Sequence, residues 1–209
     1  MNNDFEKQAR SIVNSSGFPL QIRIANLARL SSHWEVLLEE HPWHSSETNS
    51  EGFIDIVLKH KIEQYLTMVI ECKRVLQTDW VFLIHKANPN KRTHARVWDS
   101  SQERLDWWNW QVEPPSYESQ FCAIRGQEKG RRTILERTAS ELIESIEALA
   151  LQDKKIIESR IRQPGNLNLI CIPVIVTTAK LLISFFDPES ISLEDGSLPV
   201  NARFEIVPS

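Results

Sequence analysis

The chain has little cysteine: its 209 residues include only Cys72, Cys122 and Cys171. These are too few and too widely spaced for a disulfide framework or a Cys-x-x-Cys zinc site, and the odd number leaves one unpaired. An excess of basic residues is missing too, because 24 Lys and Arg against 28 Asp and Glu give a net charge of -4. This charge excludes a histone-like protein held to nucleic acid by bulk charge, but leaves room for a local basic surface. We expect a protein of the reducing cytoplasm.

Long uninterrupted hydrophobic runs are also missing. The most apolar stretch, residues 167–186, is broken by polar and proline residues such as Asn168, Pro173 and Lys180. We interpret it as buried strands and expect no membrane association. The first residues, Met1 to Glu6, are polar and acidic where a secretory signal has a basic start and an apolar stretch, so we expect no export signal.

A hydrophobic content of 41% over this length predicts one sizeable core, and we expect a single domain over residues 1–209 with elaborations. Apolar residues at helical spacing predict helices over residues 4–15, 19–30 and 134–161. Period-two or continuous apolar patterns predict strands over residues 34–42, 52–58, 66–73, 80–85, 169–177, 181–186 and 202–207. Residues 52–58 and 66–73 are expected to form an antiparallel hairpin, because a short segment links them.

Residues 86–119 show no periodicity, and Pro89, Pro114 and Pro115 interrupt them. We predict a long loop or an insertion there, of a length that is often functional.

Three charged residues stand out on the expected hairpin: Asp55 on its first strand, and Glu71 and Lys73 on its second. Side chains alternate along a strand, so Glu71 and Lys73 share one face, and Asp55 has a parity compatible with theirs. Pairing of the strands makes the two carboxylates direct or diagonal neighbours. Such neighbours repel each other unless a cation lies between them, and either a divalent metal or Lys73 meets that need.

The segments Phe53-Ile-Asp-Ile-Val57 and Val69-Ile-Glu-Cys-Lys73 resemble the bipartite D…(D/E)-x-K motif of restriction-endonuclease-like, or PD-(D/E)xK, nucleases. The predicted element order is similar to theirs as well: a helix, a three-stranded meander that carries the motif, then a helix and a further strand. The chain departs from the pattern at Ile54, which stands where the motif has its proline. The resemblance implies an α/β fold with a mixed central sheet flanked by helices, here with a Trp-rich insertion at about residues 86–119.

The resemblance also implies a Mg²⁺-dependent phosphodiesterase, a nuclease with DNA as the expected substrate, in which Mn²⁺ can replace Mg²⁺. Asp55 and Glu71 would be the metal ligands, with the Cys72 carbonyl completing the set, since hard oxygen ligands suit Mg²⁺. Lys73 would position or help to deprotonate the attacking water. Several members place an acid on the first helix, and Glu6 is the candidate here.

A plainer interpretation is that Asp55, Glu71 and Lys73 form an ion-paired patch on the solvated face of a hairpin, which is common and nearly neutral for stability. Against it, Glu71 and Lys73 follow a run, residues 66–70, with the pattern of a strand buried on both faces. The alternative function is a catalytically silent domain on the same scaffold that binds nucleic acid or protein. A third is one subunit of a defence or repair assembly, and a homodimer stays open.

Basic residues accompany the tryptophans of the insertion, and further basic residues lie in the next turn, at residues 126–132. Both groups suggest contact with phosphate. The candidates for nucleic-acid binding are Lys86, Lys91, Arg92, Arg96, Arg131 and Arg132. Trp107, Trp108 and Trp110 are expected to anchor the insertion to the core, because large aromatic side chains dominate packing. His41 and His44 are expected to be surface residues and not metal ligands. The segment 126–132 does not match a phosphate-binding loop, and no Gly-x-Ser-x-Gly motif is present.

Overall fold

The computed structural model describes residues 3–75, 78–87, 89, 91–100, 105–119, 121–124, 133–160 and 169–207. The protein is a mixed α/β structure with two mixed sheets. Its helices are α1 (Asn3–Ser15), α2 (Phe18–Leu30), α3 (Ile134–Arg160) and a 3-10 turn, η1 (Pro188–Ser190). Its strands are β1 (Trp34–His44), β2 (Glu51–His60), β3 (Leu66–Lys73), β4 (Asp79–His85), β5 (Lys91–Ser100), β6 (Leu105–Tyr117), β7 (Phe121–Ile124), β8 (Leu169–Thr177), β9 (Lys180–Phe186) and β10 (Phe204–Ile206).

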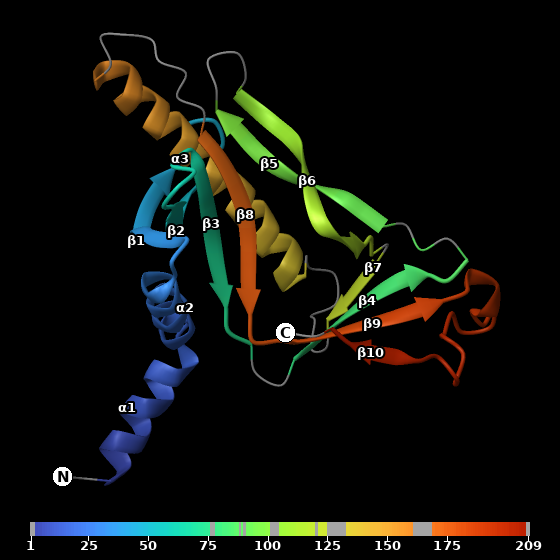
Figure 1. Ribbon diagram of the computed structural model, residues 1–209. Coiled ribbons are helices and arrows are strands. Elements are labelled where there is room, and N and C mark those ends of the chain that lie inside the picture. The colour runs from blue at the N-terminus through green and yellow to red at the C-terminus, as the bar shows by residue number, and fades with distance from the viewer. Residues whose placement is uncertain are drawn as a thin grey trace. The chain divides into compact units, whose positions relative to one another are not determined.

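The chain divides into two compact units. Unit 1 comprises residues 1–74, 96–109 and 134–177, and unit 2 comprises residues 75–95, 110–133 and 178–209. Each unit is built from segments that lie far apart in the sequence, as the colours of Figure 1 show.

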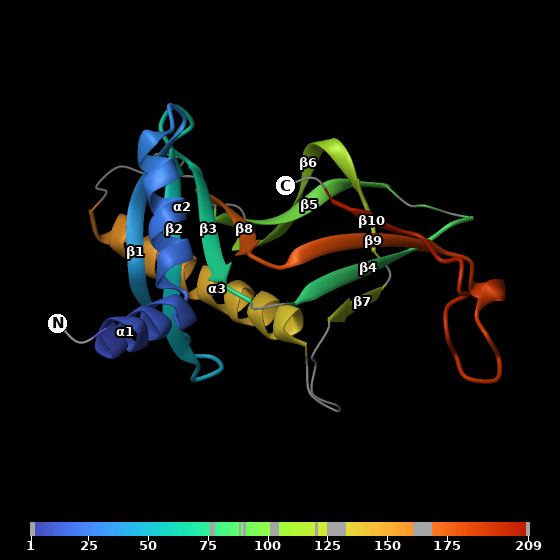
Figure 2. The ribbon, with the colours of Figure 1, turned by 90° about the horizontal axis from the view of Figure 1, so that it is seen from below.

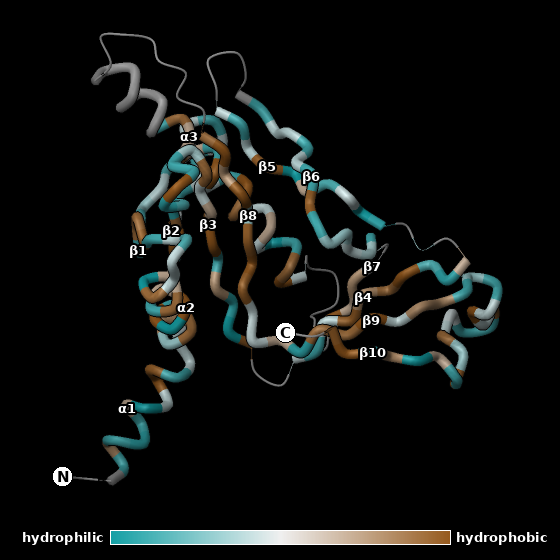
Figure 3. Tube along the Cα trace, viewed as in Figure 1, coloured by the Kyte–Doolittle hydropathy of each residue, from teal (hydrophilic) through white to brown (hydrophobic). Residues whose placement is uncertain are grey.

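Unit 1 is organised around a sheet with the strand order β1-β2-β3-β8-β5-β6. Strands β1, β2 and β3 form an antiparallel meander, and β8 lies parallel to β3, with Leu66 paired to Ile170 and Lys73 to Thr177. The predicted hairpin of β2 and β3 is therefore confirmed. Figure 3 shows that β8 is hydrophobic, and that β3 is hydrophobic until its carboxyl end, where it becomes hydrophilic. The charged residues of β3 thus follow directly on its core-forming part.

Two helices cover the meander and β8 on opposite faces (Figure 2). On the α2 face, Ala25 and Ala28 pack with Ile56 and Ile70. On the α3 face, Ile146 packs with residues next in sequence to these, since its cluster includes Val57 and Val69. Alternate residues of β2 and β3 therefore serve two cores, which explains why residues 66–70 have the pattern of a strand buried on both faces. The predicted helices of α1, α2 and α3 are confirmed.

The pairing of β1 and β2 has an irregularity between Val36 and Leu38 and is regular beyond it. Glu39 pairs with Ile56 and His41 with Ile54, so the register puts Glu40 opposite Asp55. Glu40 has a φ of 48°, in the left-handed region that residues with a side chain rarely adopt. Beyond Glu40 and Asp55, the tip of the β1–β2 hairpin (residues 41–54) packs on α3, because Trp43 and Ile54 belong to the α3-face cluster. β1 runs through Pro42 as far as His44, which an edge strand tolerates.

Unit 2 contains a second sheet with the strand order β10-β9-β4-β7. Strands β4 and β9 are parallel neighbours, and β7 and β10 pair antiparallel at the two edges. The apolar stretch is confirmed as strands from residue 169 to residue 186, where the structure describes it; β8 belongs to unit 1 and β9 to unit 2. No helix in the described part of the chain is both long enough and apolar enough to span a membrane.

The prediction of a structureless segment at residues 86–119 is wrong. Strands β5 and β6 occupy most of it, and β7, which the sequence pattern did not predict, follows. Exposed polar residues at the start of β5 hide the alternation, because Lys91, Arg92 and Thr93 are all exposed. Pro114 and Pro115 lie in β6, which is the last strand of its sheet, and an edge strand accommodates residues without an N–H group.

Candidate functional site

The candidate site lies where β2 and β3 stop pairing. Their register runs from Lys59 opposite Thr67 to Ile56 opposite Ile70 and ends there, one residue before Asp55 and Glu71. The Oδ2 atom of Asp55 accepts a hydrogen bond of 2.6 Å from the backbone N–H of Cys72. A side-chain oxygen thus takes the place of a main-chain acceptor, and the buried N–H keeps a partner where the ladder opens.

The Asp55 carboxylate is partly withdrawn from water. Burial raises its pKa above the ordinary value of 3.8, and the hydrogen bond from Cys72 and the charge of Lys73 act in the opposite direction. The carboxylate of Glu40, opposite Asp55 on β1, raises the pKa further. The cost of burial outweighs the stabilising contacts, so the carboxylate has more affinity for positive charge than a free aspartate has.

Glu71 and Lys73 form an ion pair on one face of β3, with 2.6 Å between Lys73 Nζ and Glu71 Oε1. The Glu71 side chain is only 13% exposed, and burial is the main cause that raises its pKa. The nearby Asp55 and Glu141 carboxylates act in the same direction, whereas Lys73 lowers the pKa. The predicted proximity of Asp55, Glu71 and Lys73 is therefore confirmed.

Acidic residues outnumber cations at this site. Glu40 on β1 acts on Asp55, and Glu141 on α3 acts on Glu71 and Lys73. The pKa of Lys73 is raised despite its burial, because the hydrogen bond to Glu71 and the surrounding carboxylates stabilise the ammonium group. Lys73 is the cation that influences Asp55, Glu71 and Cys72, and three carboxylates act on it: Glu71, Glu141 and Asp55.

The residues present fit a hard divalent cation as a two-carboxylate site. Asp55 and Glu71 provide hard oxygen atoms, and their mutual repulsion is what a divalent ion relieves. The Cys72 N–H points to Asp55, and in a strand the N–H and C=O of one residue point to the same side, so the Cys72 carbonyl faces the same opening. The Cys72 thiol lies in the α2-face core, where burial raises its pKa to about 12, so it remains neutral and is no ligand. Within the described residues, no group of three or more His, Cys, Asp or Glu side chains is placed to hold a metal ion.

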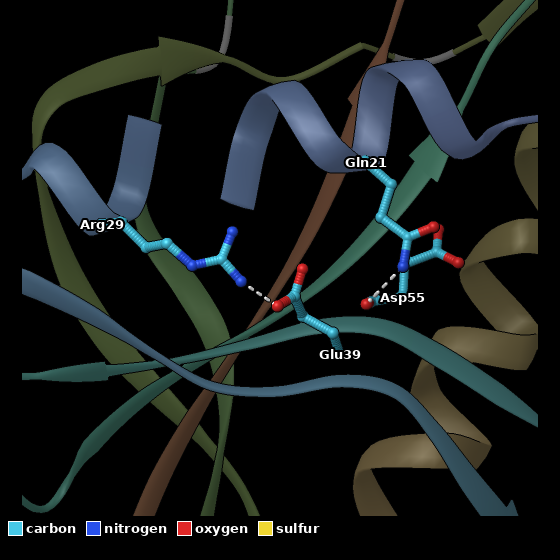
Figure 4. A network of polar contacts seen from close by, with 4 residues as sticks. All are labelled: Gln21, Arg29, Glu39 and Asp55. Carbon is cyan, nitrogen blue, oxygen red and sulfur yellow. Dashed lines mark hydrogen bonds and ion pairs between the residues drawn. The ribbon is translucent and has the colours of Figure 1, made fainter. Parts of the chain in front are cut away.

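Helix α2 reaches the site at Asp55. Gln21 is 5% exposed, and its Nε2 donates a hydrogen bond of 2.8 Å to the main-chain oxygen of Asp55. Figure 4 shows the two residues pointing toward each other, beside the separate ion pair of Arg29 and Glu39. Glu6, the predicted helix acid, is exposed on α1, which packs on α2. A neutral amide from α2 therefore fixes the backbone at Asp55.

Gln21, Glu40 and Glu141 were not predicted from the sequence. Gln21 carried a signal, because it lies four residues before Ala25 and seven before Ala28, at the spacing of the buried helix face. A polar residue on such a face needs a partner. Glu40 and Glu141 carried no such signal, since their proximity to the motif depends on the register of β1 against β2 and on the packing of α3 on the sheet.

The cations predicted to bind nucleic acid are exposed where the structure describes them. Lys86 follows β4, and Lys91, Arg92 and Arg96 lie on β5. Arg92 is paired with Glu118 at 2.5 Å, and Lys91 Nζ lies 5.7 Å from the centroid of the Tyr117 ring. Arg131 and Arg132 lie outside the described residues.

The tryptophans of β6 differ in their roles. Trp107 anchors the strand as predicted, because it packs against the α3-face core, makes an edge contact with Trp98 at 5.5 Å, and donates from Nε1 to Glu147 at 2.9 Å. The prediction is wrong for Trp108 and Trp110, which are 47% and 36% exposed. Side chains alternate along a strand, so three near-consecutive tryptophans cannot all face one core.

No protein-family model, curated protein or solved structure matches the chain. The function is therefore argued from the site.

Proposed function

We propose that the protein is a metal-dependent nuclease of restriction-endonuclease-like architecture that hydrolyses phosphodiester bonds, with DNA as its substrate. The observation that carries the proposal is the placement of Asp55, Glu71 and Lys73. They meet at the point where β2 leaves β3, with both carboxylates partly buried, Lys73 paired with Glu71 and its charge acting on Asp55.

The architecture of unit 1 supports this proposal. Helix α2 precedes an antiparallel meander, α3 follows it in the chain, and β8 adds to the sheet parallel to β3. This is the element order that the resemblance to PD-(D/E)xK nucleases implies. Glu71 and Lys73 lie at the carboxyl end of β3, and Asp55 lies on β2 one residue beyond the last β2–β3 pair, where the open ladder leaves the carboxylates outside strand pairing.

The chemistry of the three residues suits phosphodiester hydrolysis. Asp55, Glu71 and the Cys72 carbonyl would hold Mg²⁺ or Mn²⁺, which would supply positive charge for the phosphate oxygens and the leaving group. Lys73 keeps its proton at neutral pH, because its pKa is raised by Glu71 and the other carboxylates. We therefore assign to Lys73 the role of a hydrogen-bond donor that orients water or phosphate at Nζ, and not that of a general base.

A second candidate function is a catalytically silent domain on the same scaffold. The observation that favours it is the ion pair of Lys73 with Glu71, which neutralises one of the two expected ligands. The helix side chain at Asp55 is moreover the amide of Gln21 and not a carboxylate. In that case the three residues hold the open end of the hairpin together, and cleavage is absent.

The test compares purified wild type with Asp55→Asn and Lys73→Met on plasmid, linear duplex, single-stranded DNA and RNA, with Mg²⁺, Mn²⁺ or Ca²⁺. We expect wild-type cleavage with Mg²⁺ and Mn²⁺, and a loss of about 100-fold or more in each variant. Lys73→Met keeps the apolar stem of the side chain and removes only the charge. The matched control is Lys61→Met, whose exposed Nζ donates to the Ser31 carbonyl outside the motif.

Metal binding is measured independently of cleavage, through the change in melting temperature that the metal causes. A divalent ion that binds only the folded protein stabilises it by about 2.7 kcal/mol at 100 times its dissociation constant. Wild type should respond to Mn²⁺ and Asp55→Asn should not. Cleavage that survives unchanged in Lys73→Met would remove Lys73 from the reaction, and a wild type that neither cleaves nor responds to metal favours the silent domain.

A further inference from the structure

Helix α1 has an apolar stripe that the rest of the described chain leaves largely uncovered. Phe5, Ala9, Ile12 and Val13 follow the spacing of one helix face. Helix α1 packs on α2, yet Phe5 is 68% exposed and Ile12 is 64% exposed. Val13 is exposed as well. An exposed apolar face of this kind marks contact with another molecule.

Helix α1 also needs such a contact for its own stability. It has 13 residues, a length at which an isolated helix is marginal in water. The β-branched residues Ile12 and Val13, followed by Asn14, lower its intrinsic helix propensity. Most of the stability of a helix in a protein comes from the packing of its apolar face. A partner that covers the stripe therefore stabilises α1.

The charges of α1 narrow the chemistry of the partner. The helix has two acidic residues, Asp4 and Glu6, and two basic residues, Lys7 and Arg10. Their charges cancel, whereas helices that lie on membrane surfaces are rich in Lys and Arg on their polar face. Nucleic acid is likewise bound through an excess of cations. The stripe therefore fits a protein surface that carries both signs of charge.

The charges beside the stripe are complementary to themselves. With about 3.6 residues per turn, Glu6 and Arg10 lie along one border of the stripe, and Gln8 lies on the other. In an antiparallel pair of helices related by a two-fold axis, each border faces the same border of the second copy. A pair centred on Gln8 places Glu6 opposite Arg10 of the second copy, and Arg10 opposite its Glu6. The two Gln8 amides face each other, where each can donate to and accept from the other.

The apolar residues fit the same pairing. Phe5 lies three residues before Gln8, and Ala9 and Ile12 lie one and four residues after it. In the antiparallel pair, Phe5 of one copy therefore lies between the levels of Ala9 and Ile12 of the second copy. The small side chain of Ala9 leaves room for the aromatic ring, so a large residue packs into the groove beside a small one. A single centre thus pairs the charges, the amides and the apolar residues.

We propose that α1 is the contact surface of a homodimer in which the two α1 helices pair antiparallel about Gln8. Two helices of this length bury less area than a standard protein interface. We therefore expect a dimer that dissociates in the micromolar range. The proposal uses none of Asp55, Glu71 and Lys73, so it does not depend on nuclease activity.

Sedimentation equilibrium of the full chain between about 1 and about 200 μM measures the association. Wild type should be dimeric in the upper part of this range. Ile12→Glu places a charge in the apolar contact and should be monomeric throughout. Ser11→Glu is the matched control, because it adds the same charge at an exposed position away from the stripe and should dimerise as wild type does. Circular dichroism of each variant checks the fold.

A wild type that is monomeric at about 200 μM overturns the proposal. If that monomer sediments with vesicles of anionic lipid and Ile12→Glu does not, a lipid surface is the occupant of the stripe instead. A dimer that persists in Ile12→Glu, or one that Ser11→Glu disrupts equally, shows that the stripe is not the contact surface.

Charge reversals test the antiparallel pairing. Glu6→Arg and Arg10→Glu each place like charges opposite one another, and each should weaken self-association about tenfold. An equimolar mixture of the two variants should associate about as tightly as wild type, because every arginine then faces a glutamate of the other chain. Mixing leaves contacts within one helix unchanged. If the mixture associates no more tightly than the separate variants, the pairing about Gln8 is wrong.

Discussion

At the scale of single residues, the candidate site keeps a carboxylate partly buried, although burial destabilises its charged form. Asp55 keeps a hydrogen bond from Cys72 and an attraction to Lys73, yet burial leaves its pKa raised. A carboxyl whose pKa is higher in the folded than in the unfolded state binds more protons when folded over the pH range between the two values. The free energy of unfolding therefore falls as the pH rises through that range. At neutral pH the buried charge of Asp55 therefore lowers the stability of the folded protein.

The direction of this pH dependence gives a prediction for Asp55→Asn. The asparagine oxygen still accepts from the Cys72 N–H, but the buried charge and its repulsion with Glu71 and Glu40 are gone. We expect a melting temperature at pH 7 that is higher by about 3 °C, the shift that about 1 kcal/mol causes in a chain of this size. The gain should shrink as the pH falls toward 3.8, the ordinary pKa below which Asp55 becomes protonated in both states. Melting curves of metal-free protein from pH 4 to 8 measure it.

The control for this prediction is Glu39→Gln on β1. Glu39 is exposed and paired with Arg29, so its loss should change stability by less than about 1 kcal/mol. If Asp55→Asn is less stable than wild type at pH 7, the attraction of Asp55 to Lys73 outweighs the cost of burial. The inference that burial and the neighbouring carboxylates destabilise the charged Asp55 would then be wrong.

At the scale of elements, the site depends on a local departure from regular pairing that no periodicity predicts. The alternation of Trp34, Val36 and Leu38 predicts β1, and the residue types of β2 and β3 predict the hairpin and the parity of Asp55, Glu71 and Lys73. The left-handed residue at Glu40 has no such signal, because two consecutive glutamates are also found on ordinary exposed strands. Beyond Glu40 the hairpin tip nevertheless packs on α3, because Trp43 and Ile54 belong to the α3-face cluster.

The left-handed backbone conformation of Glu40 gives a second prediction. A residue with a Cβ atom pays about 1 kcal/mol or more for a left-handed conformation, and glycine does not. Within a regular strand, Gly is less stable than Ala. Here we expect the reverse, with Glu40→Gly more stable than Glu40→Ala by about 1 kcal/mol in denaturant unfolding. Both variants lack the carboxylate, so the comparison isolates the backbone.

The same pair at Glu39, where no positive φ occurs, is the control and should show alanine as the more stable residue. If alanine is also the better residue at position 40, β1 does not keep its left-handed residue in solution.

At the scale of the whole molecule, local patterns predict elements but not their partners. The strands near residues 80–85 and 181–186 were both predicted, yet their parallel pairing as β4 and β9 joins segments about a hundred positions apart. Nothing in either segment specifies the other, because both are short apolar runs. The second sheet was missed for this reason, and the strands β5 and β6 were missed because exposed cations and prolines mask their alternation.

The whole molecule has a net charge of -4, so binding to nucleic acid needs a local cluster of cations. Among the candidates on β5, Arg92 is neutralised by Glu118, whereas Arg96 is exposed and has no ion-pair partner in the described part of the chain. Lys91 is exposed and rests near the Tyr117 ring. A free cation releases one counterion when it meets a phosphate, but a paired cation must first lose its partner.

We therefore expect Arg96→Gln and Lys91→Gln each to reduce the salt dependence of duplex binding by about one unit in the slope of log K against log salt. Arg92→Gln should change this slope by less than half as much. Binding isotherms of a fluorescent duplex at several salt concentrations, without divalent metal so that cleavage is absent, provide the slopes. Lys59→Gln on β2 serves as the control for a general loss of charge. If all four variants change the slope alike, the duplex is attracted by overall charge, and β5 is not the contact surface.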